Sequence, residues 1–551
     1  MYLPLAALVP LVFLQAPPQP VFGKEELRAA ARVAALEFTD AELALLEKDA
    51  LELAGGYRAL FPIALENELD PAFTFDPRPP GMHVDAAPLP LVPVPLPAPE
   101  RPADLDDLAF ADLPTLAALV RARKVSCVEL AKSTLARVRR LDAQLHAVVN
   151  VTEERALAQA ERLDRELAEG RWRGLLHGIP WGAKDLFAVA GTPTTWGSKL
   201  YEAQRIERDA TVVARLDAAG AVLVCKTSLG EFAYGDLWFG GRTRTPWNPE
   251  KGSSGSSAGS ASLVAAGGLP FALGTETLGS IVSPCTACGA TGIRPSFGRV
   301  PRTGGMNLSW TMDKVGPIAR SVLDASIVLE AVVGPDGADP AVRYMPFRAR
   351  EAAARDVRGW RVGYLAGAFE RARDDAHVLD ELRALGVELV PIDLPDDVPL
   401  EPLLVILTAE AATAFDALTR DGRDDQMAWQ APQAWPNTFR AARLIPAVEY
   451  LRAQRLRTRV MRALDARLGD LRAFVHPTFG NASLVMTNLT GHPAIVCPSS
   501  APLEDGAPRS ITFTGRVDRE EELVRLADVW QRASGFHRAH PTLEAALRKV
   551  K

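Results

Sequence analysis

The stretch from Lys251 to Arg294 constrains the fold of this chain more than any other segment. It reads KGSSGSSAGSASLVAAGGLPFALGTETLGSIVSPCTACGATGIR, and no charged side chain lies between Lys251 and Glu276. A flexible linker would not hold the apolar run LVAAGGLPFAL in its middle, because such a run favours burial. Buried hydroxyl groups need hydrogen-bond partners, and glycines beside them indicate close backbone approach. The sequence therefore predicts two serine clusters held close together in a packed core.

These residues resemble the amidase signature family of serine hydrolases. The family's pattern is a Gly-Gly-Ser-Ser-Gly-Gly-Ser block, a small-residue segment, and then Gly-Thr-Asp-x-Gly-Gly-Ser-Ile-Arg-x-Pro. The family places 24 positions between its bridging serine and its nucleophile, which is the separation of Ser256 and Ser280, whereas Ser253 and Ser280 are 27 apart. We therefore take residues 255–260 as the block, with Ser256 as the bridging serine and Ser280 as the nucleophile.

A third motif supplies a base. The family's Gly-x-Pro-x-x-x-Lys-Asp motif is matched by residues 178–185, GIPWGAKD, so Lys184 takes the place of the family's catalytic lysine. An ordinary lysine is protonated at neutral pH, but burial among apolar neighbours lowers its pKa. A neutral Lys184 could accept a proton from Ser256 while Ser256 accepts one from Ser280, which activates Ser280 as a nucleophile.

The resemblance also implies the surroundings of the nucleophile. The backbone N–H groups of Thr277, Leu278, Gly279 and Ser280 are expected to form an oxyanion hole, and the Gly255–Ser256 peptide bond is expected to be cis. The candidates for the substrate pocket are Ser257, Ile281 and Val282. The chain departs from the family pattern at two positions, because Leu278 and Val282 replace a glycine and an arginine. No lysine or arginine lies between Lys251 and Arg294, so we expect a neutral, fairly apolar acyl group.

Other interpretations of these motifs are weaker. Gly255-x-Ser257-x-Gly259 matches the nucleophile elbow of α/β-hydrolases, but that elbow follows a strand, and the preceding RTPWNPEKGSS is typical of a loop. His476 and His492 would allow a Ser-His-Asp site, yet structural histidines are favoured. Cys285 and Cys288 form a single C-x-x-C motif. We interpret them as small buried residues, because a zinc site would need two more ligands nearby.

The resemblance extends from Phe110 to about Pro541 and implies an α/β fold, with a single large amidase signature domain built on a mixed β-sheet and helices on both faces. We expect this catalytic domain over residues 106–545. Residues 23–76 form a helical N-terminal extension, since Thr39-Asp-Ala-Glu42 is a capping box and an apolar face follows. This face should pack on the catalytic domain. Residues 77–105 form a linker, because ten prolines fall between Pro77 and Pro102.

Residues 1–22 are interpreted as a signal peptide or an apolar leader. Tyr2–Leu14 is almost wholly apolar and too short for a membrane span, but no lysine or arginine precedes it. The leader favours export, periplasmic or secreted, and a cytoplasmic location is the alternative.

The sequence therefore predicts an amidase, a hydrolase of the carbon–nitrogen bond of linear amides. Two alternatives stay open: a glutaminase-type subunit of an amidotransferase, and a noncatalytic binding protein that keeps the fold. Net charge is −6 and no Lys/Arg-rich block occurs, which argues against a dedicated nucleic-acid binder. The expected partner is a small amide substrate, with no cofactor, no metal and no obligate protein partner; a homodimer is allowed.

Overall fold

The computed structural model describes residues 22–79, 81–82, 96–348, 356–504 and 506–543. The predicted leader thus lies almost wholly outside the described residues, and so does the middle of the predicted linker. Among the helices of the described ranges, none combines the length and the apolar composition that a membrane span requires.

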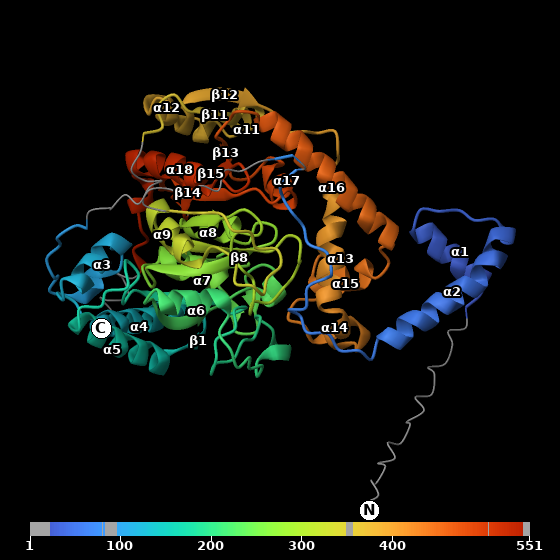
Figure 1. The fold of residues 1–551 in the computed structure, drawn as a ribbon, viewed down its shortest axis with the longest axis horizontal. Helices are drawn as coiled ribbons and strands as arrows, with labels where there is room; N and C mark the ends of the chain where they lie inside the picture. The colour runs from blue at the N-terminus through green and yellow to red at the C-terminus, as the bar shows by residue number, and fades with distance from the viewer. Residues whose placement is uncertain (1–21, 80, 83–95, 349–355, 505, 544–551) are drawn as a thin grey trace, which may run out of the picture.

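A mixed sheet of 11 strands forms the centre of the molecule (Figure 1). Its strand order is β1-β3-β2-β8-β10-β9-β14-β15-β13-β11-β12. Two small hairpins, β4-β5 and β6-β7, lie outside this sheet. The strands are β1 Val148–Val151, β2 Pro180–Lys184, β3 Val222–Thr227, β4 Leu237–Trp238, β5 Gly241–Arg242, β6 Arg244–Thr245, β7 Asn248–Gly252, β8 Phe271–Glu276, β9 Thr291–Arg294, β10 Lys314–Ala319, β11 Arg361–Leu365, β12 Glu388–Ile392, β13 Ala473–Pro477, β14 Ala494–Pro502 and β15 Pro508–Gly515.

Helices flank the sheet and bury it in one continuous apolar core. The predicted α/β class with a mixed central sheet is therefore confirmed. The helices are α1 Lys24–Val33, α2 Asp40–Leu60, α3 Leu113–Arg121, α4 Cys127–Leu145, α5 Glu153–Ala168, α6 Thr211–Ala218, α7 Ala258–Ala265, α8 Val282–Cys288, α9 Val322–Val332, α11 Ala366–Arg371, α12 His377–Ala384, α13 Val405–Ala414, α14 Asp416–Arg420, α15 Trp435–Ala442, α16 Ala447–Leu468, α17 Ser483–Leu489 and α18 Glu520–Ser534.

Three neighbouring strands gather the polar residues of the candidate site. Strands β2 and β8 are parallel, with Ala183 opposite Leu273, so their carboxyl ends lie side by side. Strand β10 is antiparallel to β8 and begins at the same edge, with Lys314 opposite Glu276. Because parallel neighbours end together, the last residue of β2, Lys184, is brought close to the last residues of β8.

The segment around Ser256 packs onto this edge because its residues are small. Helix α7 begins directly after Ser257, and all of its residues are buried. A Cβ atom added at Gly259 would lie 2.2 Å from the Ala147 carbonyl oxygen, and one at Gly274 would lie 2.6 Å from Ser257 Oγ. Glycine at these two positions therefore permits the close approach of α7 to the sheet.

The N-terminal extension differs from its prediction in two ways. Its helices end at Leu60, and residues 61–79, here called the strap, run without helix along the catalytic domain. The apolar face of α2 does not pack on that domain: the α1–α2 hairpin stands away from it in Figure 1, and Leu53 and Tyr57 are more than half exposed. The capping box is present, with the Thr39 hydroxyl accepting from the Glu42 N–H, because capping needs only local residues.

Candidate functional site

Lys184 is the centre of a cluster of hydroxyl groups. Its Nζ lies 2.8 Å from Ser256 Oγ, 3.1 Å from Ser257 Oγ and 2.9 Å from Thr275 Oγ1. Ser253, the alternative bridging serine, instead donates to the Ser254 carbonyl oxygen. The structure thus places Ser256, and not Ser253, against Lys184.

The protonation of Lys184 follows from its surroundings. The side chain is fully buried, and burial lowers the pKa of the Lys184 ammonium to about 7, although the nearby carboxylates of Asp313 and Glu276 oppose this shift. The hydroxyl proton of Ser257 is donated to the Thr275 carbonyl oxygen, so Ser257 Oγ must accept from Lys184. A neutral lysine donates two hydrogens and keeps one lone pair, so the lone pair can accept from Ser256.

Ser256 and Ser280 are held beside each other by the backbone. The Ser257 N–H donates to the Ser280 carbonyl oxygen at 3.1 Å, and the Gly255–Ser256 peptide bond is cis, as expected. Ser256 is fully buried, whereas Ser280 keeps 8% of its surface exposed. Among the described residues no hydrogen bond engages the Ser280 hydroxyl, which leaves it free to turn toward Ser256 or toward a bound molecule.

The turn that carries Ser280 presents unpaired backbone donors. Within the described ranges, no acceptor is recorded for the backbone N–H groups of Thr277, Leu278, Gly279 and Ser280. Consecutive unpaired N–H groups beside a hydroxyl can stabilise an oxyanion. The arrangement is thus compatible with the oxyanion hole that the sequence resemblance implied.

Glu276 holds this turn in place. Its carboxylate accepts from the N–H groups of Ile281 and Val282 at 2.8 and 2.9 Å, and its other oxygen accepts from Arg294 at 2.7 Å and Asn488 at 2.9 Å. Burial alone would raise the pKa of Glu276, but the charge of Arg294 and these hydrogen bonds lower it to about 2. Glu276 is therefore an ionised, fully buried anchor at the end of β8.

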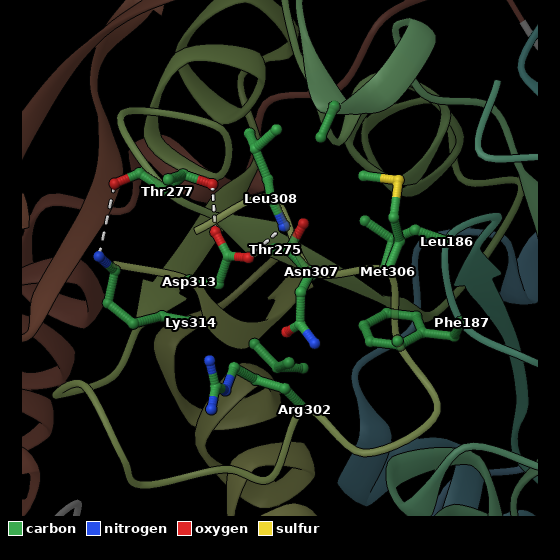
Figure 2. Close-up of a pocket in the computed structure, with 13 residues that line it drawn as sticks. Leu186, Phe187, Thr275, Thr277, Arg302, Met306, Asn307, Leu308, Asp313 and Lys314 are labelled. Atoms are coloured by element: carbon green, nitrogen blue, oxygen red, sulfur yellow. Dashed lines mark hydrogen bonds between the residues drawn. The ribbon is translucent and has the colours of Figure 1, made fainter. Parts of the chain in front are cut away.

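A cavity opens beside these residues (Figure 2). Thr275 and Thr277 reach it from the nucleophile side, and the Thr277 hydroxyl donates to Asp313 Oδ1 at 2.6 Å. The remaining lining combines apolar residues with two basic side chains, a carboxylate and an amide: Leu186, Phe187, Ala233, Arg302, Gly305, Met306, Asn307, Leu308, Asp313, Lys314 and Val315. The space measures about 10 Å³, which is room for about one water molecule.

The three residues expected in the substrate pocket do not line this cavity. Ser257, Ile281 and Val282 are buried in the core, and none of them lines this cavity. Two basic residues outside the stretch Lys251–Arg294, Arg302 and Lys314, line the cavity. Lys314 reaches the site because β10 pairs antiparallel with β8.

The competing sequence interpretations lose support from the contacts. Ser257, the serine of the elbow motif, has its hydroxyl fixed between Lys184 and the Thr275 backbone. The preceding residues 248–252 form strand β7 rather than loop, but in a small hairpin outside the main sheet. His476 contacts Thr514 and Ser483, and His492 contacts Thr490, so neither histidine reaches Ser280.

Sequence reasoning missed four residues of the site: Thr275, Glu276, Arg302 and Asp313. Thr275 and Glu276 stand inside the motif of the nucleophile, and Asp313 inside the segment TMDKVGP, so neighbouring motif positions could have indicated them. Arg302 carries no such signal, because its role depends on contacts with the strap.

Comparison with known proteins places these features in context. A family model described as Amidase matches residues 129–484. The chain is 33% identical to a glutamyl-tRNA(Gln) amidotransferase subunit from Roseiflexus sp. (strain RS-1), over 76% of this chain and 96% of that one. Among solved structures, native peptide amidase from Stenotrophomonas maltophilia is similar with a TM-score of 0.71 and 30% identity, covering 78% of this chain and 98% of the enzyme. An amidase family protein from Bacillus anthracis str. Ames is 25% identical with a TM-score of 0.70, covering 79% and 93%.

Proposed function

Because the chain belongs to the amidase signature family, we propose that it is an amidase that cleaves a carboxamide through an acyl-enzyme on Ser280. The contact of 2.8 Å between Lys184 Nζ and Ser256 Oγ in a fully buried cluster carries this proposal. A lysine with a pKa of about 7 is suited to act as a base near neutral pH.

The proposed steps use these residues in turn. Neutral Lys184 takes the hydroxyl proton of Ser256, and Ser256 takes that of Ser280, whose oxygen attacks the carbonyl carbon. The unpaired N–H groups of residues 277–280 bind the oxyanion that forms. The proton on Lys184 returns through Ser256 to the leaving nitrogen, so that ammonia or an amine departs. Water then attacks the ester to Ser280 and releases the acid.

We further propose that the acyl group near the scissile bond is neutral and apolar. Five apolar side chains line the cavity: Leu186, Phe187, Met306, Leu308 and Val315. The two basic side chains that also reach it are not available to a substrate carboxylate. Arg302 is held by Asp339 through two hydrogen bonds of 2.8 and 2.9 Å. Burial shifts the pKa of Lys314 well below its ordinary value, which favours its neutral form.

The test is turnover of simple amides by folded variants. We expect Ser280→Ala to lose activity by about 10⁴-fold or more, while its thermal unfolding stays that of the parent chain. Ser256→Ala should lose less, because a water molecule can bridge the gap between Lys184 and Ser280. Amide hydrolysis by folded Ser280→Ala at the rate of the parent would overturn the proposal.

The glutaminase-type subunit remains the second candidate, because several relatives carry the name of a glutamyl-tRNA(Gln) amidotransferase component. One measurement of ammonia release distinguishes the two functions. Neutral aliphatic and aromatic amides are compared with glutamine, asparagine and malonamate at equal concentration. We expect a higher kcat/KM for the neutral set; a preference for glutamine would favour the glutaminase-type function.

A further inference from the structure

A second cavity of about 250 Å³ lies between the strap and the catalytic domain. It is lined by Glu68 and Asp70 of the strap and by six residues of the catalytic domain: Arg208, Arg302, Thr303, Asn307, Ala338 and Asp339. Arg302 and Asn307 line this cavity and the cavity beside Thr275 and Thr277. The two spaces therefore share a wall.

The strap is fastened to that shared wall by paired amide contacts. Asn67 Oδ1 accepts from the Asn307 N–H at 2.7 Å, and Asn67 Nδ2 donates to the Asn307 carbonyl oxygen at 3.0 Å. A side chain with two such contacts fixes the backbone of Asn307 in one place. The position of the second cavity is thus set by residues 240 positions apart in the sequence.

The side chains that line the second cavity include three carboxylates and two arginines. Glu68 pairs with Arg208, and Asp339 pairs with Arg302. Asp70 also contacts Arg302, which Asp339 already neutralises; its Oδ1 lies 3.2 Å from Arg302 Nη2. Burial raises the pKa of Asp70 against the charge of Arg302, so the ionised form still carries a desolvation cost that a bound cation would reduce.

An unused acceptor points to the same kind of ligand. Asn307 is only 4% exposed, and its Oδ1 is buried without a hydrogen-bond partner among the described residues. Figure 2 shows its amide group extending toward Arg302. A buried acceptor without a partner is uncommon, because leaving it unpaired costs free energy. A ligand that donates N–H hydrogen bonds would satisfy it.

We propose that the second cavity is a subsite for an ammonium group at the end of the substrate remote from the scissile bond. Asp70 provides the charge, and Asn307 Oδ1 provides a further acceptor. A substrate that reaches this subsite from the scissile bond must pass the shared wall at Arg302 and Asn307. The inference rests on the proposed amidase function for its substrate class, but binding of the cation does not depend on turnover.

The first experiment measures binding by calorimetry. Cadaverine is titrated into the full chain and into Asp70→Asn, with pentanediol as the neutral probe. We expect cadaverine to bind the parent chain, to bind Asp70→Asn about tenfold or more weakly, since one charged hydrogen bond is lost, and pentanediol to bind neither. The matched control is Asp76→Asn, also in the strap, because Asp76 pairs with Arg78 and does not line the cavity. Asp70→Glu keeps the charge and should retain binding.

The second experiment measures kcat/KM for ω-aminoalkanamides of increasing length against neutral alkanamides of matched length. At the length that spans the two cavities, the parent chain should favour the amino substrate by about tenfold, and Asp70→Asn should lose that preference while keeping its rate on the neutral amide. No cadaverine binding, or equal binding by the parent and Asp70→Asn, overturns the subsite. Cadaverine binding without hydrolysis of any amide would instead overturn the proposed function and leave the subsite standing.

Discussion

The stretch Lys251–Arg294 buries polar side chains, whereas the α1–α2 hairpin exposes apolar ones. In the first, five of the six serines of the small-residue cluster are fully buried, namely Ser253, Ser256, Ser257, Ser260 and Ser262, while Ser254 is exposed. In the second, Leu45 is 80% and Leu53 55% exposed. Residue type alone would predict the opposite in both regions.

The difference shows that available partners decide burial. Ser260 Oγ donates to the Leu273 carbonyl oxygen at 3.0 Å, and Ser262 Oγ to that of Arg244 at 2.7 Å, so these hydroxyls lose little when they leave water. Among the described residues, helix α2 packs mainly against α1, and a single neighbour covers a single side of a helix. The catalytic stretch is therefore positioned through many directional bonds, whereas the hairpin is tied to the domain through the strap.

The sharpest test of this contrast removes the buried base. We expect Lys184→Ala to reduce kcat/KM for a neutral amide by about 10⁴-fold, because no other base of the described ranges is hydrogen-bonded to Ser256. The control is Lys199→Ala, an exposed lysine paired with Glu202, which should keep the rate of the parent. An active Lys184→Ala would mean that the buried cluster is structural.

The next test breaks the anchor of the nucleophile turn. Glu276→Gln should lower the free energy of unfolding by about 3–5 kcal/mol, because it leaves Arg294 buried without its charge partner. Urea unfolding measures this change. Glu153→Gln, which removes a half-exposed partner of Arg139, should cost less than about 1 kcal/mol. Equal losses in both variants would contradict the role assigned to buried directional bonds.

The stability that Glu276 supplies should also depend on pH. Its pKa in the folded chain is about 2 and its ordinary value is 4.5, so its contribution is present above pH 4.5 and is lost as the pH falls toward 2. The difference in unfolding free energy between the parent chain and Glu276→Gln should therefore shrink over this window. A constant difference down to pH 2 would argue against an ionised Glu276.

A smaller effect is expected in the pH profile of turnover. Below its pKa of about 7, Lys184 is protonated and cannot accept a proton, so kcat/KM should fall about tenfold for each pH unit and level off above neutrality. The profile is measured on a neutral amide, whose own charge does not change. An optimum near pH 4 would exclude a lysine base.

The smallest effect is expected in the hairpin. Leu53→Ala should change the free energy of unfolding by less than about 0.5 kcal/mol, since the side chain is exposed in the parent. Leu141→Ala, at a fully buried leucine of α4, should cost about 2–5 kcal/mol. A large loss in Leu53→Ala would show that the exposed face of α2 is covered in solution.

The sequence alone determined the family, the fold class and the register of the serine block. These follow from motif spacing, since Lys184, Ser256 and Ser280 must meet at one edge for the motifs to function together. The sequence also predicted the capping box at Thr39, which the structure forms at the start of α2. Short apolar runs and helix caps depend on neighbouring residues, so the structure that they form can be predicted from the sequence.

Only the tertiary structure decided which residues line the cavities and what the N-terminal extension does. Asn67 pairs with Asn307, and Asp70 pairs with Arg302, so these contacts join segments more than 200 positions apart. The hydrophobic periodicity of a sequence gives no information on such a pairing. The amphipathic pattern of α2 predicted an apolar face but could not say whether anything would cover it. A local sequence determines which face of a helix is apolar, whereas the burial of that face depends on which other segment packs against it.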